Sequence, residues 1–412
     1  MFYTVFLNLY NIGVRVTSLW NPKAKLWLKG RKHFPVLNFK SEPSTQNIWI
    51  HCASLGEFEQ GRPVIEQIKK LYPSAKIIIT FFSPSGYEIQ KNYTGADAIF
   101  YLPSDSKKNA KKMIEAINPS LVLWVKYEYW FYYLKAFRQR NIPVLLVSGI
   151  FRESQPFFKW YGKMWQQILP SFTHFFVQDE ASKNLLASIG VDRNVTISGD
   201  TRFDRVIEIA QKFEHIPLIQ QFCGDSKVIV AGSTWEEDEA ELIHYVRANP
   251  QIKFIIAPHE IDVENLKEVK KEFTGSVFYS ELILNQPATS NVLIIDNVGM
   301  LSRLYHYADI TYIGGGFGDD GVHNVLEAAV YGKPVIYGPI FEKFIEAIEL
   351  FNCGGGITIN NALELKKELT LLWNDEQLLK TAGEAAGSYV YANSGASKTI
   401  TDYIQEKRLL TK

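Results

Sequence analysis

The chain has 412 residues, carries no formal net charge, and is 46% hydrophobic and 21% charged. A chain of this length is longer than a domain with one typical hydrophobic core, so we predict two domains. The neutral charge balance argues against nucleic acid as a partner. The cysteines are too scattered for a disulfide framework or a zinc site. We therefore expect reduced, buried thiols in a cytoplasmic protein at Cys52, Cys223 and Cys353.

The first 40 residues combine an apolar, aromatic stretch with a basic one. Arg15 is the only charge before residue 21, and five basic residues follow at Lys23, Lys25, Lys29, Arg31 and Lys32. No apolar run reaches the about 18–20 residues that span a bilayer, and a signal peptide would carry its charges first. Two compatible interpretations remain open: a helix lying on an anionic membrane surface, and a first helix packed on its own domain. We predict a membrane-associating segment at 1–40.

Short apolar runs alternate with helical stretches along the rest of the chain, which is typical of parallel βαβ units. The strands predicted in the first half lie at 48–51, 76–82, 98–101, 121–125, 144–148, 175–178 and 195–198. Those of the second half lie at 228–231, 254–257, 277–279, 292–295, 310–313 and 335–336. Helices are predicted at 57–71, 106–117, 236–249 and 324–330, and from residue 363 onward.

This order of elements predicts an α/β protein with two doubly wound, Rossmann-like halves joined near residues 205–220. Sheets of this kind bind ligands at the carboxyl ends of their strands, and two such halves facing each other form a cleft. After the segment at 1–40, the predicted division is a first domain at 41–210, a second at 211–388, and a final helix at 389–412 that crosses back to the first domain.

Glu57 follows the strand at 48–51 and lies in the first turn of the next helix, directly after Gly56. A carboxylate at this edge of the sheet is suited to act as a general base on a sugar hydroxyl. A first-turn glutamate also interacts favourably with the helix dipole without any catalytic role. The spacing alone favours this second interpretation.

A glycine-rich loop, Gly314–Gly318, connects the strand at 310–313 to the helix that carries Glu327. Such a loop can present backbone N–H groups and the positive end of a helix to an anion. It has neither dinucleotide-binding nor P-loop spacing, and no cluster in the chain has metal-ligand spacing, so we expect the Asp319-Asp320 pair to be solvated. Glycines present for packing alone are the less favoured interpretation, because glycine costs chain entropy.

Polar residues at four further strand ends each have a functional and a structural interpretation. Glu128 stands among aromatic residues and is either a partly desolvated carboxylate or a helix cap. Arg202 either brings a positive charge to the predicted cleft or forms a salt bridge at the hinge. His259 either binds a phosphate or caps the end of a strand. Ser233-Thr234 are expected to cap a helix, and they could also contact a phosphate.

Together these segments resemble the Kdo (3-deoxy-D-manno-octulosonic acid) transferase family, whose members have two Rossmann-like domains in the glycosyltransferase-B arrangement. The most specific match is His323-Asn324-Val325-Leu326-Glu327, which corresponds to the His-Asn-x-Leu-Glu block of that family. The other matching motifs are Ser54-Leu55-Gly56-Glu57, Glu128 after its strand, Gly199–Asp204, Gly232–Thr234, Gly332–Val335 and Gly338-Pro339.

The resemblance implies that Glu57 is the general base acting on a glucosamine hydroxyl of a lipid A precursor, and that Glu128 and Arg202 stabilise the transition state. It implies a CMP-Kdo donor held by Pro258, His259, Gly299, Met300, Asn324, Val325, Leu326 and Glu327, with Ser233 and Thr234 as candidate phosphate contacts. The implied displacement inverts the anomeric carbon without a metal or cofactor. It takes place at the cytoplasmic face of the inner membrane, with no nucleic acid partner.

The chain departs from the family pattern at several positions. Arg202 stands in place of the usual Lys, His259 in place of a frequent Arg, Met300 in place of a frequent Glu, and Val322 in place of a glycine. Two other functions remain open. One is a transferase of the same architecture that uses a UDP-sugar and a lipid or cell-wall acceptor, and the other is a nucleotide-sugar epimerase.

Overall fold

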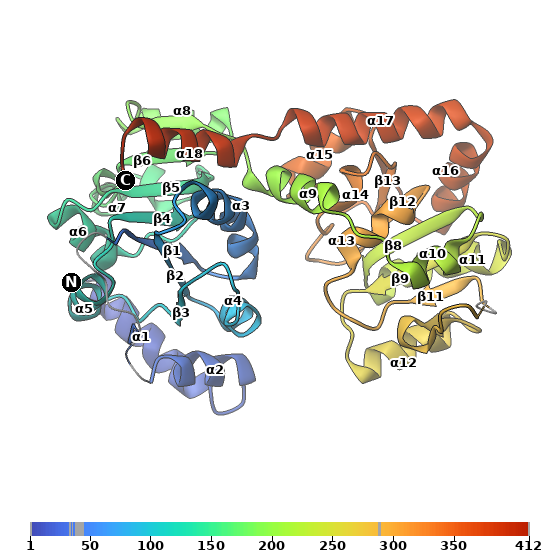
Figure 1. Ribbon diagram of the computed structural model, residues 1–412, viewed down its shortest axis with the longest axis horizontal. Coiled ribbons are helices and arrows are strands. Elements are labelled where there is room, and N and C mark those ends of the chain that lie inside the picture. Colours follow the sequence, from blue (N-terminus) through green and yellow to red (C-terminus); the bar gives the residue numbers. More distant parts are fainter. Residues whose placement is uncertain (1, 33, 35, 38–44, 287–289, 411–412) are drawn as a thin grey trace. The chain divides into compact units, whose positions relative to one another are not determined.

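The computed structural model describes residues 2–32, 34, 36–37, 45–286 and 290–410, and the chain forms two compact units (Figure 1). Unit 1 consists of Met1–Arg205 and Ser394–Lys412, and unit 2 of Val206–Asn393. The first boundary lies within helix α9 (Thr201–Gln211), close to the division expected after residue 210. Residues 1, 33, 35 and 38–40 of the expected first segment, and 411–412 of the last helix, lie outside the described residues.

Unit 1 is built on a seven-stranded parallel sheet in the order β3-β2-β1-β4-β5-β6-β7. Its strands are β1 (Asn47–Cys52), β2 (Lys76–Phe81), β3 (Ala98–Tyr101), β4 (Leu121–Val125), β5 (Val144–Gly149), β6 (His174–Val177) and β7 (Val195–Ile197). Its helices, besides the start of α9, are α1 (Phe2–Thr17), α2 (Pro22–Gly30), α3 (Leu55–Leu71), α4 (Pro84–Gln90), α5 (Lys107–Ile117), α6 (Phe131–Gln139), α7 (Lys163–Gln166), α8 (Glu180–Ser188) and α18 (Ala396–Glu406).

Helices cover both faces of this sheet because its strands are apolar on both sides. Ile48 and Ile50 of β1 point into a core shared with α3 and α18, whereas Trp49 between them points into a second core shared with α5 and α6. Alternate residues of one strand therefore serve two cores. The polar groups that remain accessible in such a sheet are those at its strand ends.

Unit 2 has a second seven-stranded parallel sheet in the order β10-β11-β9-β8-β12-β13-β14. Its strands are β8 (Val228–Thr234), β9 (Lys253–Pro258), β10 (Val277–Phe278), β11 (Val292–Ile294), β12 (Ile310–Ile313), β13 (Val335–Tyr337) and β14 (Gly356–Thr358). Its helices, besides the end of α9, are α10 (Pro217–Cys223), α11 (Glu236–Ala248), α12 (Val263–Glu272), α13 (Leu301–Leu304), α14 (Leu326–Ala329), α15 (Ile345–Asn352), α16 (Ala362–Asn374) and α17 (Glu376–Ala392).

The predicted fold class, an α/β protein with two doubly wound parallel sheets, is confirmed. Each predicted strand overlaps an observed one, but β14 was not predicted, because its few residues after Gly354-Gly355 carry too little pattern. The helix predicted at 324–330 covers only Leu326–Ala329. The expectation of buried thiols is wrong for Cys353, which is exposed.

Helices α1 and α2 pack on unit 1, as the second interpretation of the first segment expected. The hydroxyl of Tyr3 in α1 donates a hydrogen bond of 2.6 Å to Asp105, and its ring lies against those of Phe131 and Trp165. Arg31, which we had counted among the basic residues of a membrane-facing stretch, instead donates to backbone oxygens of unit 1. Within the described part of the chain, every helix is too short or too polar to cross a membrane.

Candidate active site

The residues predicted to be catalytic lie at the carboxyl edge of the first sheet. Strands β1 and β4 are neighbours in the sheet, although β2 and β3 come between them in the sequence. From this pair, the later strands of each half follow one another toward the two opposite edges of the sheet. The position between β1 and β4 is therefore the topological switch point, where sheets of this class bind ligands. Glu57 follows β1 and Glu128 follows β4, so one carboxylate stands on each side of the switch point.

Glu57 lies in the first turn of α3, which begins at Leu55 with Ser54 as its N-cap. The hydroxyl of Ser54 donates a hydrogen bond to Oε2 of Glu57, and the glutamate is only partly buried. The helix dipole stabilises a negative charge at this place. The two interpretations of Glu57 are therefore compatible, since a carboxylate oriented by the helix terminus also remains accessible.

Glu128 lies beside a buried histidine. Its Oε2 is 3.6 Å from Nε2 of His51, and Nδ1 of His51 is 3.0 Å from the backbone oxygen of Thr80. Within the described residues, neither the Nε2 of His51 nor the Oε2 of Glu128 has a hydrogen-bond partner, although both atoms are buried. The alternative that Glu128 caps a helix is wrong, because α6 begins at Phe131 with Trp130 as its N-cap.

Glu57 acts electrostatically on Cys52 together with Glu128, and on Tyr127 together with Arg202. Burial raises the pKa of the Cys52 thiol well above its ordinary value, and the negative charges of Glu57 and Glu128 add a smaller effect in the same direction. Burial also raises the pKa of Tyr127, with Glu57 adding to the effect and Arg202 opposing it. Glu57, Glu128 and Arg202 therefore share one neighbourhood, in which Cys52 is an inert, neutral thiol.

Asp200 orients the side chain of Arg202. It accepts from Nε of Arg202 at 2.8 Å and from the Arg202 backbone N–H at 2.9 Å, and Gln60 donates to it at 2.9 Å. Although burial opposes its charge, Arg202 and Lys126 hold the pKa of Asp200 below its ordinary value. This salt bridge joins residues two positions apart within unit 1 and holds the guanidinium in a partly exposed position. It is not the salt bridge at the hinge that we considered as the structural role of Arg202, which stays a prediction.

The rest of this motif anchors the start of α9. The hydroxyl of Thr201 donates to the backbone oxygen of Gln60 in α3 at 2.6 Å. The carboxylate of Asp204 accepts from the backbone N–H groups of Gly395 at 2.6 Å and Ser397 at 2.7 Å, at the beginning of α18. The Gly199–Asp204 segment therefore positions Arg202 and also joins α3, α9 and α18.

The predicted donor residues surround the switch point of the second sheet, which lies between β8 and β12. The glycine-rich loop after β12 uses its N–H groups internally. Gly314 donates to the backbone oxygen of Gly232 at 2.9 Å, and Gly315 donates to the carboxylate of Asp238 at 2.7 Å. The N–H of His323 returns to the oxygen of Gly314 at 3.0 Å. These three N–H groups are therefore not available to a bound anion.

The glycines of this loop are required by close backbone packing. A Cβ at Gly314 would lie 2.2 Å from the backbone oxygen of Ser233, and a Cβ at Gly316 would lie 2.6 Å from the backbone nitrogen of Gly338. The helix that follows, α14, has only four residues. The structure thus supports the packing interpretation that we had favoured less, and it does not support the loop as an anion cradle.

Three rings form a stacked cluster at the same edge. The ring centroids of Trp235 and His259 are 4.6 Å apart, and those of His259 and His323 are 4.5 Å apart, with interplanar angles of 22° and 15°. Nε1 of Trp235 donates to Nε2 of His323 at 2.9 Å, so this nitrogen carries no proton and the imidazole is neutral. Burial lowers the pKa of His323 to about 4, and the electrostatic effect of His259 makes a smaller contribution in the same direction.

This lowered pKa predicts an acid-sensitive unit 2. In the unfolded chain His323 titrates near 6.5, so its contribution to folding is complete above that pH and is lost as the pH falls toward 4. The expected loss is about 3 kcal/mol of unfolding free energy. Urea unfolding of the wild type and of His323→Gln at neutral and acidic pH measures it. An equal acid sensitivity of the two proteins would contradict the assignment.

The remaining predicted donor residues differ in what their side chains can reach. Nδ2 of Asn324 donates to Oε1 of Glu327 at 3.1 Å, and both residues are partly exposed. The side chains of Val325 and Leu326 are fully buried, so they belong to the core of unit 2. Pro258, the last residue of β9, is buried as well.

Four more predicted positions lie at the ends of strands or helices. Thr234 is buried, and its hydroxyl donates to the side chain of Glu239 at 2.8 Å. The capping interpretation is wrong for Thr234, because the N-cap of α11 is Trp235. Ser233 is partly buried with a φ of 54°. Gly299 is exposed, and Met300 is a buried residue that precedes α13. A phosphate contact therefore suits Ser233 better than Thr234.

Sequence reasoning did not single out Asp238, which holds this edge together. The side chain is fully buried and accepts hydrogen bonds from Gly315, from the N–H of Trp235 at 3.0 Å and from the hydroxyl of Tyr312 at 2.8 Å. An acidic residue three positions after the N-cap is a capping-box signal, and Asp238 stands in this position relative to Trp235. His51 carried no comparable signal.

Residues 28–205 match the family described as 3-deoxy-D-manno-octulosonic-acid transferase (kdotransferase). A 3-deoxy-D-manno-octulosonic acid transferase of Haemophilus influenzae is 27% identical over 88% of this chain and 87% of its own length. The chain is thus similar to the Kdo transferase family in this region and to a curated member of it over most of its length. These similarities support an enzyme of the glycosyltransferase class.

Two further likenesses extend beyond the matched region. A bifunctional glycosyltransferase/methyltransferase of Fusobacterium nucleatum is 28% identical over 93% of this chain, which spans only 61% of that relative. The crystal structure of UDP-GlcNAc 2-epimerase from Neisseria meningitidis bound to UDP-GlcNAc has a TM-score of 0.63 and 19% identity, covering 88% of this chain and 100% of that one. At this level of identity the likeness shows the fold, which many unrelated activities share.

Proposed function

We propose that the chain transfers Kdo from CMP-Kdo to the glucosamine disaccharide of a lipid A precursor, with inversion at the anomeric carbon. The observation that carries the proposal is the partly exposed Glu57 at the switch point of the first sheet, with Glu128 and Arg202 in its neighbourhood. A chain similar to Kdo transferases, with an accessible carboxylate at that edge, has the group that an inverting displacement requires.

In the proposed reaction Glu57 removes the proton of the acceptor hydroxyl as its oxygen attacks the anomeric carbon. The bond between that carbon and the CMP phosphate oxygen breaks, and the bonding electrons leave with the phosphate. Positive charge develops on the sugar ring and negative charge on the leaving group. Glu128 and Arg202 are suited to stabilise these charges, because an oriented carboxylate and an oriented guanidinium need no reorganisation during the step.

The donor is proposed to bind unit 2 through Pro258, His259, Gly299, Met300, Ser233 and the Asn324–Glu327 block. The stacked cluster of Trp235, His259 and His323 supports this part of the proposal, since flat rings beside a polar edge suit a nucleobase. Glu327, oriented by Asn324, is suited to accept hydrogen bonds from a ribose. No metal or cofactor is part of the proposal.

The acceptor side of the proposal rests on where α1 and α2 dock. They contact Phe82 after β2, Leu102 after β3 and Phe131 after β4, at the same sheet edge as Glu57. A membrane-associated pair of helices at that edge would keep a lipid-linked hydroxyl close to the proposed base. We therefore propose a peripheral location at the cytoplasmic face of the inner membrane.

The deciding experiment is incubation with CMP-Kdo and a tetraacylated lipid A precursor, read by mass spectrometry. The expected product is heavier than the acceptor by one or more Kdo units. A UDP-sugar offered in place of CMP-Kdo is the matched control and is expected to give no product. Transfer from the UDP-sugar alone would favour the other transferase that the sequence left open.

Nucleotide preference gives a second, independent test. CMP at a hundredfold excess over its dissociation constant stabilises a binding unit by about 2.7 kcal/mol, which raises Tm by about 5 °C or more, whereas UDP is expected to have little effect. Glu327→Ala is expected to lose most of the CMP shift. The control Glu384→Ala, which changes an exposed glutamate of α17, should keep it. A larger shift with UDP would overturn the donor assignment.

A further inference from the structure

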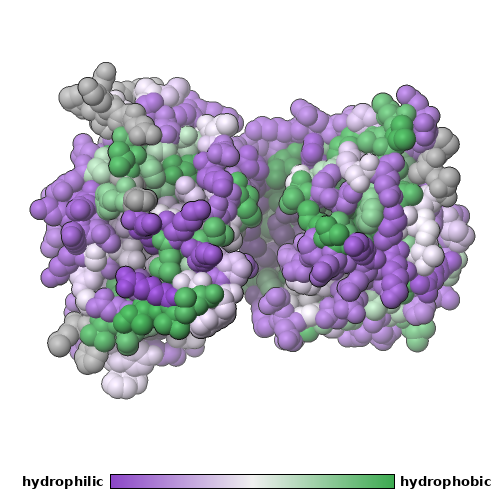
Figure 2. Space-filling view, turned by 90° about the horizontal axis from the view of Figure 1, so that it is seen from below, coloured by the Kyte–Doolittle hydropathy of each residue, from purple (hydrophilic) through white to green (hydrophobic). Residues whose placement is uncertain are grey.

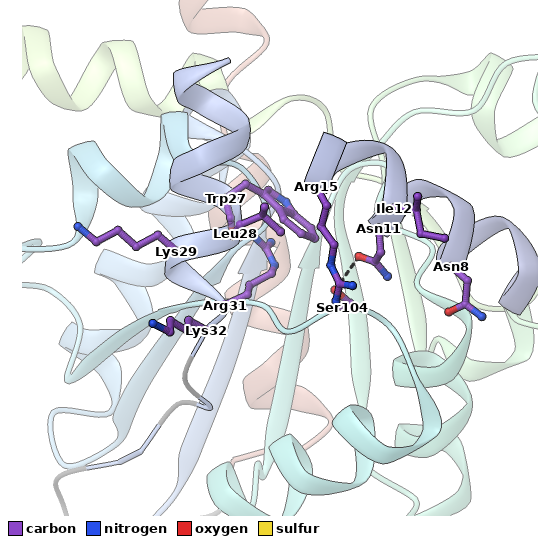
Figure 3. A pocket seen from close by; sticks show the side chains of 10 residues that line it. All are labelled: Asn8, Asn11, Ile12, Arg15, Trp27, Leu28, Lys29, Arg31, Lys32 and Ser104. Carbon is purple, nitrogen blue, oxygen red and sulfur yellow. Dashed lines mark hydrogen bonds between the residues drawn. The ribbon is translucent and has the colours of Figure 1, made fainter. Parts of the chain in front are cut away.

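A groove with a volume of about 890 Å³ lies between α1 and α2 (Figure 3). Its position is set by unit 1 alone, because its residues come from these two helices, the turn after α2 and the segment after β3. Among the residues that the structure describes, neither Asp nor Glu lines it. The lining residues are Asn8, Asn11, Ile12, Arg15, Trp27, Leu28, Lys29, Arg31, Lys32 and Ser104.

Arg31 forms a fixed cationic part of this groove. Its guanidinium donates to the backbone oxygens of Leu102 at 2.8 Å and Phe82 at 2.6 Å, and it stacks on Trp27 with 3.9 Å between the guanidinium carbon and the ring centroid. Burial lowers the pKa of Arg31 to about 9, which still leaves it charged at neutral pH. Within the described ranges, the charge of Arg31 is balanced by carbonyl dipoles and not by an acid.

The other cations of the groove are accessible. Arg15, Lys29 and Lys32 are exposed, and among the residues that the structure describes they form no ion pair. In Figure 3 Arg15 extends from α1 toward Ser104, whereas Lys29 and Lys32 extend outward on the side of α2. Asn11 and Ser104, joined by a hydrogen bond of 3.2 Å, add neutral polar groups next to Arg15. The groove thus offers several donors and an excess of positive charge.

The outer side of α1 is apolar and exposed. Five of its residues are between 49% and 63% exposed: Val5, Phe6, Leu9, Ile12 and Val16. Figure 2 looks at the side of unit 1 on which these helices lie and shows a hydrophobic band there. Ile12 belongs both to this apolar side and to the lining of the groove, so hydrocarbon and cations meet along one helix.

We propose that the groove between α1 and α2 binds the phosphate-bearing headgroup of an anionic glycerophospholipid, whose acyl chains lie along the apolar side of α1. Arginine and lysine with neutral amide and hydroxyl donors, and no acid, suit a phosphate. The adjoining hydrocarbon selects a lipid over free phosphate. This inference rests on the proposed membrane association and makes it specific, because it replaces a diffuse attraction by one bound headgroup.

Vesicle binding with two matched double variants tests the groove. Arg15→Gln with Lys29→Gln removes two groove charges, and Lys23→Gln with Lys25→Gln removes two exposed charges of α2 that do not line the groove. Each cation near an anionic surface contributes about fivefold to binding. On vesicles of phosphatidylcholine with phosphatidylglycerol, we expect the groove variant to lose at least about tenfold more affinity than the control variant. Equal losses would overturn the proposal in favour of diffuse attraction.

Competition separates the lipid from free phosphate. Short-chain phosphatidylglycerol below its micellar concentration is expected to displace the protein from vesicles, and inorganic phosphate at the same concentration is not. Equal displacement by the two would overturn the lipid assignment. Pure phosphatidylcholine vesicles are expected to bind wild type and both variants equally weakly, and tight binding to them would also contradict the proposal.

Activity on a detergent-dispersed acceptor keeps this inference separate from the proposed function. Both double variants are expected to transfer Kdo at the wild-type rate in detergent, because the changed side chains lie outside the proposed catalytic and donor sites. If the vesicle test fails while transfer proceeds, only the groove assignment is lost. If wild type shows no transfer with any donor, the proposed function fails whatever the vesicles show.

Discussion

Glu57→Gln is expected to lower the rate of Kdo transfer by about 10²- to 10⁴-fold, the usual contribution of a general base. Glutamine keeps the size and the polarity of the side chain but cannot accept the proton of the acceptor hydroxyl. The hydroxyl of Ser54 can still donate to the amide oxygen, so α3 should begin in the same way. Donor binding in unit 2 should be unchanged, and single-turnover transfer together with CMP binding measures both effects.

The matched control is Glu66→Gln, on the same helix but two turns further along. This substitution removes an ion pair with Arg62 and is expected to lower the unfolding free energy by less than about 1 kcal/mol. The rate of Kdo transfer is expected to stay at the wild-type value. Wild-type turnover of Glu57→Gln would remove Glu57 as the base. Loss of CMP binding in that variant would show a structural defect in place of a chemical one.

Gly314→Ala is expected to lower the unfolding free energy of unit 2 by about 3 kcal/mol or more. The new methyl group would lie 2.2 Å from the backbone oxygen of Ser233, and backbone at the end of a central strand cannot move aside as a flexible side chain does. A change of this size lowers Tm by about 6 °C or more for a unit of this length. Calorimetry or urea unfolding of unit 2 measures it.

Gly318→Ala is the control within the same loop. The nearest atom to its added Cβ is the backbone oxygen of Gly315 at 3.8 Å, which is an ordinary contact. Its stability should therefore remain within about 0.5 kcal/mol of the wild type. Equal stability of both variants would mean that the loop is not packed as described, and the anion-binding interpretation would regain support.

The strands were predictable because each is buried on both faces. A run such as Ile77-Ile78-Ile79 is apolar throughout, which marks a buried parallel strand whatever its neighbours are. The helix after β12 was less predictable, because Asn324 and Val325 continue the helical pattern but precede the helix. Local pattern does not report where the first intrahelical hydrogen bond forms.

The candidate site was predictable only as separate motifs. Glu57 and Glu128 were recognised because each follows a buried strand, yet no spacing in the sequence shows that β1 and β4 are neighbours. Asp200 stood in a recognised motif as well, but its hydrogen bond with Gln60 depends on the packing of α3 against the start of α9. These contacts are long-range in sequence and follow from strand order.

The sequence by itself determined the α/β class, the positions of Glu57 and Glu128 after buried strands, the helical position of Glu327, and an apolar, basic first segment. Burial pattern and composition are local properties, which is why they could be recognised. Only the tertiary structure decided that β1 and β4 adjoin, that Gly314 is required by the backbone of Ser233, and that Arg31 is bound within unit 1. The physical reason is that each of these outcomes depends on atoms brought together across many residues. Neither periodicity nor motif spacing encodes such contacts.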